Sequence, residues 1–175
     1  MTSSFSSDLV LETSLQCYFF DQLAQLNRIQ ANPLANEDIF YSSLVMDKFG
    51  MSHQLFEQKE GRPSEKILGL KLMQASHLPK KKRIRELKDI GDTALFICGF
   101  FQDSLNKKIV DVSYYRDIGQ AAYSKLNHLV PSFYDVDSFY NEFSKKFNNA
   151  ALLMELLSRE CLSNAKEDDL IWIAS

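Results

Sequence analysis

The sequence predicts an all-α protein: a single globular bundle of six or seven helices around one central buried helix at about residues 80–102. Gly occurs only six times and Pro four times in 175 residues, which argues against a turn-rich β protein. Hydrophobic residues make up 45% of the chain and charged residues 25%, so a substantial core can form. Almost every segment repeats its apolar residues at the helical spacing. No long linker divides residues 1–175, and we expect one domain.

The first three predicted helices lie between breaks in the sequence. Residues 8–30 carry one apolar stripe, and Pro33 marks its end. Asn36 is expected to cap a second helix, because its side-chain oxygen can accept a hydrogen bond from a free backbone N–H. A short helix is expected over 64–77 and should end before Pro79.

The most strongly periodic stretch covers residues 84–105 and predicts the central helix. Its second half is apolar nearly all round, which is typical of a buried helix. Gly91 and Gly99 each cost about 1 kcal/mol relative to Ala inside a helix. We therefore expect other helices to approach closely at these two positions. Phe100 and Phe101 are expected in the core.

The C-terminal part of the chain predicts two further helices. Asp111 is expected to cap the first, which ends before Pro131. Asp135 is expected to cap the second and longest, in which Phe, Leu and Met residues continue one stripe as far as Cys161.

The cysteines indicate a reducing compartment. Cys17, Cys98 and Cys161 are odd in number, far apart and set among apolar neighbours, so neither a disulfide framework nor a CxxC metal site is predicted. The first residues lack the features of a secretory signal, and no apolar run approaches the roughly 20 residues of a membrane span. We expect a cytoplasmic protein that is not exported.

Sequence motifs of catalysis are not found. His53, His77 and His128 are isolated and form no HExxH pair, and no Walker loop, GxGxxG or GxSxG motif occurs. We therefore predict no catalytic residue, no metal ligand and no cofactor, and we do not expect an enzyme.

The main charged feature is a basic run at the start of the central helix, in a chain of net charge -3. It consists of Lys80, Lys81, Lys82, Arg83 and Arg85. Cations at a helix N-terminus oppose the macrodipole by a few tenths to about 1 kcal/mol each. An acidic protein surface or a phosphate group would find N–H donors and cations together there. The alternative is a solvated surface in which Arg85 and Lys88 offset Asp89 and Asp92.

A second candidate anion site mixes basic and aromatic residues, namely Lys107, Lys108, Tyr114 and Arg116. Nucleotide rings stack on aromatic side chains while cations hold phosphate. Tyr115 belongs to the core stripe of its helix, so the cluster is also explained by packing.

Two apolar features are candidates for docking a partner or a second copy of the chain. They are Phe96 and the C-terminal tail that contains Trp172. The alternative is that these side chains fold back onto the core, because exposed apolar patches are uncommon on monomers.

Two strings within residues 84–126, Asp89-Ile90-Gly91-Asp92-Thr93-Ala94-Leu95-Phe96-Ile97-Cys98-Gly99-Phe100-Phe101 and Tyr114-Tyr115-Arg116-Asp117-Ile118-Gly119-Gln120-Ala121-Ala122-Tyr123, resemble a pattern of uncharacterised bacterial all-helical proteins. The shared pattern is GDxALFxxGFF followed by YYxxxGxxAY. The resemblance implies a bacterial cytoplasmic origin, and it implies no activity, cofactor or site residue.

The sequence can fill a core but carries no catalytic or metal-binding motif, so we expect the surface of the protein to carry its function. We predict a non-enzymatic regulatory or adaptor protein that acts through contacts with another macromolecule, in the first place another protein. A sensor of a small or nucleotide-like ligand is one alternative, which a pocket reaching Tyr114 and Arg116 would favour. A nucleic-acid-binding protein that uses residues 80–85 is the other.

Overall fold

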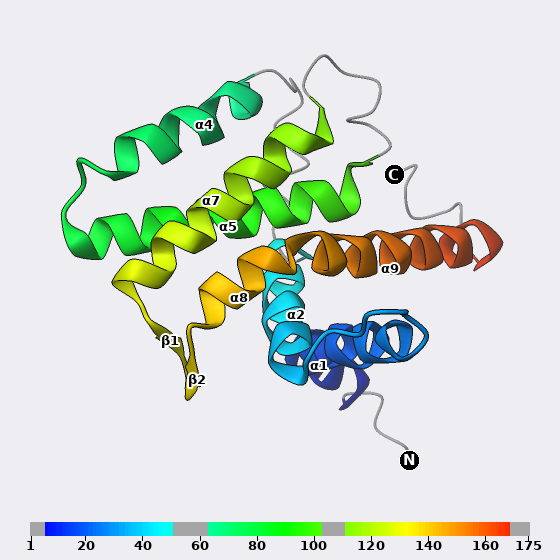
Figure 1. Ribbon diagram of the computed structural model, residues 1–175. Helices are drawn as coiled ribbons and strands as arrows, with labels where there is room; N and C mark the ends of the chain where they lie inside the picture. Colours follow the sequence, from blue (N-terminus) through cyan, green and yellow to red (C-terminus); the bar gives the residue numbers. More distant parts are fainter. Residues whose placement is uncertain (1–5, 51–62, 103–110, 169–175) are drawn as a thin grey trace.

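Seven helices and a small β-hairpin make up the part of the chain that the computed structural model describes, residues 6–50, 63–102 and 111–168 (Figure 1). None of the described helices is long and apolar enough to cross a membrane. The predicted all-helical bundle is confirmed. Its elements are α1 (Ser6–Arg28), α2 (Asn36–Gly50), α4 (Pro63–Ala75), α5 (Lys80–Phe100), α7 (Val112–Leu129), β1 (Ser132–Phe133), β2 (Val136–Asp137), α8 (Phe139–Lys145) and α9 (Phe147–Asp168).

Helix α5 is the central helix, as the sequence predicts, and it packs against α2, α4, α7 and α9. The close approaches expected at its glycines are confirmed. A Cβ added at Gly91 would lie 2.6 Å from the ring of Tyr123 in α7, and one at Gly99 would lie 2.6 Å from Cβ of Met154 in α9. Both glycines therefore let a neighbouring helix approach the α5 backbone.

Helices α5 and α7 run antiparallel. Gly91 lies against Tyr123, and further along α5 Ala94 lies beside Gly119. Cys98, nearer the end of α5, lies beside Val112 at the start of α7. The start of α5 is therefore close to the end of α7, and α4 packs against both helices.

The connection between α1 and α2 is held by Asn27, whose amide both donates to and accepts from the backbone of Leu34. The expected capping role of Asn36 is not observed. The side-chain bond at this helix start is instead made by Asp38, which accepts a hydrogen bond from the Ala35 backbone N–H over 3.1 Å. A side chain three residues into a helix reaches back to its N-cap in the same way in a capping box.

The prediction of one long helix from Asp135 is wrong. Asp135 lies in the turn of the β1–β2 hairpin, which the backbone N–H of Ser138 closes by bonding to the Pro131 carbonyl. Helix α8 follows, and a break at Lys146 separates it from α9. The aromatic stripe that includes Phe143 is buried on both sides of this break, so the apolar periodicity alone could not reveal the break.

Two smaller expectations also differ from the structure. Asp111 stands at the N-cap of α7 as predicted, but its carboxylate accepts a hydrogen bond from the Ser113 hydroxyl and makes no capping bond to the backbone. Phe100 and Phe101 are half-buried at the edge of the core and not fully buried.

Candidate functional site

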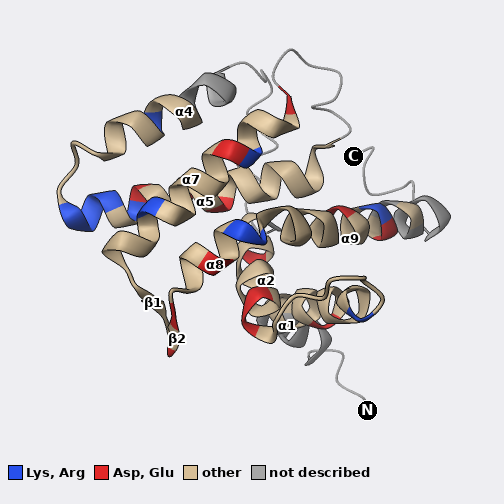
Figure 2. Cartoon of the chain, viewed as in Figure 1, with Lys and Arg blue, Asp and Glu red and all other residues tan. Residues whose placement is uncertain are grey.

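The basic run occupies the first turns of α5, where Figure 2 shows a continuous basic stretch. Lys80, Lys81, Lys82 and Arg85 are exposed, and none of them has an ion-pair partner among the described residues. The first turn of α5 holds no acidic residue. These cations therefore lie, without a compensating anion from the described chain, at the helix end whose dipole disfavours them.

Arg83 has a different environment from the rest of the basic run. Its Nη2 donates hydrogen bonds to the backbone carbonyls of Ser76, over 2.8 Å, and Leu78, over 3.0 Å. These bonds tie α5 to the end of α4. The Nε of Arg83 is buried and has no hydrogen-bond partner within the described part of the chain. An unsatisfied guanidinium donor at this depth is uncommon.

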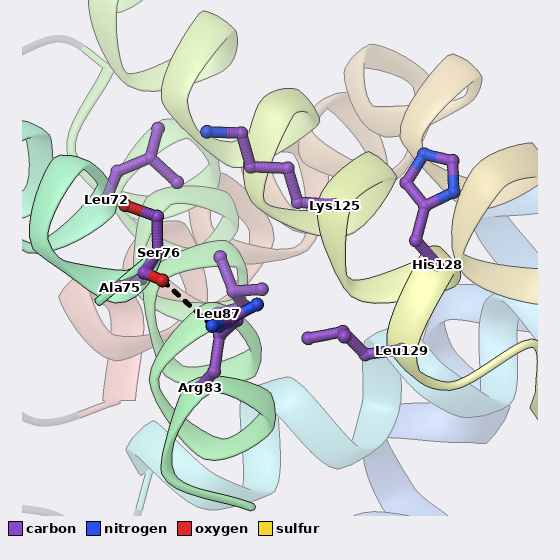
Figure 3. A pocket seen from close by; sticks show the side chains of 8 residues that line it. All are labelled: Leu72, Ala75, Ser76, Arg83, Leu87, Lys125, His128 and Leu129. Atoms are coloured by element: carbon purple, nitrogen blue, oxygen red, sulfur yellow. Dashed lines mark hydrogen bonds between the residues drawn. The ribbon is translucent and has the colours of Figure 1, made fainter. Parts of the chain in front are cut away.

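Arg83 lines a pocket of about 240 Å³ between α4, α5 and α7 (Figure 3). In Figure 3 the Arg83 guanidinium lies beside Ser76, to which its hydrogen bond is drawn, and the Lys125 side chain extends from α7 toward Leu72. His128 lies at the far side from Arg83. Apolar side chains form most of the wall. The lining residues are Leu72, Ala75, Ser76, Arg83, Leu87, Lys125, His128 and Leu129.

The chemistry of this pocket suits an anion that is attached to an apolar group. A guanidinium offers several N–H donors in fixed directions, and the ammonium of Lys125 adds a mobile positive charge. No acidic side chain lines the pocket. A carboxylate or phosphate oxygen could accept from Arg83 while the atoms beside it contact leucine side chains.

The described residues of the second predicted anion cluster, Tyr114 and Arg116, do not line this pocket. Lys107 and Lys108 lie outside the described residues. Tyr114 and Arg116 lie in the first turns of α7, at the opposite end of that helix from Lys125. The ring of Tyr114 packs edge-on against Tyr115, and its hydroxyl lies close to Gly69 of α4. Of the described members of the second cluster, neither Tyr114 nor Arg116 lines the pocket.

The prediction that Phe96 is available for docking is wrong. Phe96 is only 3% exposed and stacks between the rings of Phe49 and Phe100 at centroid distances of 4.8 and 4.4 Å. At this level of α5 most sides are buried, and Thr93, Ile97 and Phe100 form a half-buried side. The other docking candidate, Trp172, lies outside the described residues.

A buried polar cluster centres on Asp92 of α5. Oδ1 of Asp92 accepts hydrogen bonds from the hydroxyls of Tyr41, over 2.5 Å, and Tyr123, over 2.9 Å. Oδ2 accepts from Lys88 over 2.7 Å and lies 3.4 Å from Nζ of Lys48. Burial raises the pKa of both tyrosines well above 10, and the charge of Asp92 adds to this effect.

This cluster has no access for a substrate. Asp92 is completely buried, and aromatic rings enclose Tyr41 at centroid distances of 5.0 to 5.9 Å. We interpret the cluster as a link between α2, α5 and α7 and not as a reaction centre. The enclosing rings are those of Tyr123, Phe133, Phe139, Tyr140 and Phe143.

The remaining reactive groups make no further site in the described ranges. Burial raises the pKa of the Cys98 thiol to about 12, so the thiol stays protonated at neutral pH and is a poor nucleophile. No group of three or more His, Cys, Asp or Glu side chains in these ranges could hold a metal ion.

Sequence reasoning identified Arg83 but missed the other residues of the pocket. Lys125 and His128 lie more than 40 residues further along the chain, and no local pattern connects them with the basic run. The signal that could have suggested them is the polar side of α7, whose last turns carry both residues opposite a strongly apolar stripe.

A comparison of the chain with protein families, curated proteins and solved structures finds no match. The functional interpretation therefore depends on the chemistry of the basic run and the pocket.

Proposed function

We propose that this protein is a non-enzymatic adaptor that binds an acidic segment of a partner protein through the start of α5 and the adjoining pocket. The observation that carries the proposal is the set of exposed cations at Lys80, Lys81, Lys82 and Arg85, which have no ion pair with the described residues. An acidic segment would supply the negative charge that the helix end lacks. Its carboxylates could accept hydrogen bonds from the free backbone N–H groups there. Steering by such charges favours fast, salt-sensitive association.

The pocket favours a protein partner over a nucleic acid. A protein surface that binds nucleic acid is strongly positive and mostly polar, whereas this chain has net charge -3 and the pocket wall is largely apolar. An acidic protein segment can offer carboxylates and apolar side chains together.

The second candidate function is the binding of a small anionic ligand, and the concave shape of the pocket is the observation that favours it. Its volume of about 240 Å³ is below the roughly 300 to 1,000 Å³ of most small-molecule sites. The size therefore suits one or two side chains of a larger partner better than a whole ligand.

We propose the cytoplasm as the place of action. Cys17, Cys98 and Cys161 are all free thiols in the structure, and Cys98 is buried. Free thiols that are distributed in this way are typical of proteins in a reducing compartment.

Affinity capture from the native host, with identification of bound proteins by mass spectrometry, tests the proposal. The parent chain is compared with the Lys81→Ser, Lys82→Ser double variant. The matched control is Arg28→Ser, Lys145→Ser, which removes the same charge from exposed positions elsewhere. We expect a partner with an acidic segment to be captured by the parent and the control, and to be lost with the double variant or at high salt.

Two results would contradict the proposal. One is equal capture of every partner by the parent and the Lys81, Lys82 variant at low salt. The other is recovery of a co-purified metabolite as the sole bound species, which would favour the small-ligand function.

A further inference from the structure

We propose that the pocket between α4, α5 and α7 holds one carboxylate side chain of the acidic partner segment together with an apolar residue next to it in the segment. This inference rests on the proposed function and adds to it a specific recognition element. The exposed cations of α5 attract any acidic segment, whereas the pocket selects segments in which an acid and an apolar residue are neighbours.

The carboxylate is assigned to the Arg83 side of the pocket. Nη2 of Arg83 is used by the carbonyls of Ser76 and Leu78 and Nε is fully buried, so the nitrogen left for a carboxylate is Nη1, which has no hydrogen bond with the described residues. Lys125 is exposed at the α7 wall and has no ion pair with the described residues. A carboxylate can accept from a guanidinium and an ammonium simultaneously, because its two oxygens offer about four acceptor sites.

The apolar neighbour is assigned to the wall formed by Leu72, Leu87 and Leu129. Met73 of α4 is 73% exposed and is not a lining residue of the pocket. At 100° per residue it lies about 100° around the helix from the lining residue Leu72. We assign Met73 to the part of the segment that leaves the pocket over α4, because methionine side chains adapt readily to apolar partners.

The shape of the pocket supports a protein segment as the source of the carboxylate. Its volume of about 240 Å³ fits a side chain or two, and the exposed cations of the basic run begin next to Arg83. A segment bound at the pocket can continue along these cations, whereas a small free acid would leave them without a partner.

The test uses two short peptides that are blocked at both ends and labelled for fluorescence. The leucine peptide contains the step Glu-Leu-Leu among Asp residues. The serine peptide has the same charge and carries two serines in place of the leucines. Affinity is measured by fluorescence anisotropy at low salt, and the binding site is located by backbone amide NMR shifts of the protein.

The protein variants are chosen at exposed positions, since a change at Arg83 would also disturb the α4 to α5 connection. Lys125→Met removes the mobile charge of the pocket, and Met73→Ser removes an exposed apolar side chain of α4. Arg28→Met is the matched control for Lys125→Met, because it removes an exposed cation from the end of α1. Circular dichroism checks that each variant keeps the helical fold.

We expect the leucine peptide to bind at least about fivefold more tightly than the serine peptide, because the pocket removes its apolar side chains from contact with water. Lys125→Met should weaken the leucine peptide about five- to tenfold, and Arg28→Met should leave it unchanged. Met73→Ser should weaken the leucine peptide and not the serine peptide. The NMR shifts should centre on Leu72 and Leu129.

Equal affinity of the two peptides for the parent would overturn this inference and leave the proposed function standing. Failure of both peptides to bind would overturn this inference and the proposed function. Free hexanoate is the third probe: if it binds the pocket as tightly as the leucine peptide, the source of the carboxylate is a small acid and not a protein segment, and the inference is wrong.

Discussion

Tyr41 donates a hydrogen bond from its phenol to Oδ1 of Asp92 over 2.5 Å, and both side chains are buried in the middle of the bundle. Tyr123 donates to the same oxygen, and Lys88 donates to the other. A buried carboxylate is tolerated only when its oxygens are hydrogen-bonded or paired with charge, and Asp92 has both. The bonds connect α2 and α7 to the central helix at one point.

Replacing Tyr41 with Phe should lower the free energy of unfolding by about 1 to 3 kcal/mol, because the buried carboxylate loses one donor. The measurement is urea denaturation followed by circular dichroism. Tyr134→Phe is the control, since Tyr134 is exposed at the hairpin turn and should change stability by less than about 0.5 kcal/mol. Equal stability of both variants and the parent would show that the Tyr41 bond to Asp92 contributes nothing.

The stability of the protein should fall as the pH rises above about 10. Burial raises the pKa of Tyr41 and Tyr123 well above 10 and that of Tyr140 to about 12. In the unfolded chain these groups lose their protons near pH 10, while the folded chain keeps them, so the unfolded state binds fewer protons there and unfolding becomes easier. The contribution is complete below pH 10 and is lost as the pH rises toward the folded-state pKa.

Urea midpoints measured from pH 8 to pH 11.5 check this pH dependence, and absorbance at 295 nm follows tyrosine ionisation. We expect Tyr123→Phe to have a shallower loss of stability with pH than the parent. Ionisation of all the tyrosines near pH 10 in the folded protein would show that these hydroxyls are not buried as described.

Gly91→Ala should destabilise the protein, although Ala is the better helix former by about 1 kcal/mol. The added Cβ would lie 2.6 Å from the ring of Tyr123, which its bond to Asp92 holds in place. We expect a net cost of about 1 to 3 kcal/mol, as for other overpacked cores. Gly69→Ala is the contrast, because its Cβ would press on the hydroxyl end of the Tyr114 side chain and meet Cδ1 of Ile118 at an ordinary 3.7 Å. Thermal unfolding of both variants would contradict this account if Gly91→Ala were the more stable of the two.

Arg83→Ser should destabilise the protein and Lys82→Ser should not, although the two residues are adjacent in the basic run. Arg83 donates to the carbonyls of Ser76 and Leu78, so its loss should cost about 1 to 3 kcal/mol. Lys82 is exposed at the start of α5, and removing its charge should leave stability unchanged or raise it by a few tenths of a kcal/mol. Denaturation of the two single variants in parallel measures the difference, and similar losses for both would show that Arg83 has no special structural role.

The helical class, the central helix and the close packing at Gly91 and Gly99 could be predicted from the sequence, because apolar spacing and unfavourable glycines are local signals. The break at Lys146 could not be predicted from the sequence, because the aromatic stripe continues through the break without a change of period. Ser138 has a φ of 52°, an uncommon backbone state that no local residue pattern indicates.

The candidate site was predicted only in part. Residues 80–85 stand out in the sequence because five cations cluster in an acidic chain. The distinct role of Arg83 depends on its bonds to the end of α4, and the pocket depends on the approach of Lys125 from α7. The solvated-surface alternative for the basic run pairs Lys88 with Asp92 at the surface. The ion pair with Lys88 exists, but the burial of Asp92 and its bonds to two tyrosines are tertiary features.

The most direct test of the central claim is the salt dependence of binding between the leucine peptide and the start of α5. Fluorescence anisotropy is recorded at several salt concentrations for the parent and for a variant with Lys80, Lys81, Lys82 and Arg85 changed to Ser. We expect the parent to bind more weakly as salt rises past physiological strength, where the Debye length is about 8 Å. We also expect the variant to bind weakly at every salt concentration and to keep its helical spectrum. Equal binding by the parent and the folded variant at low salt would contradict the central claim.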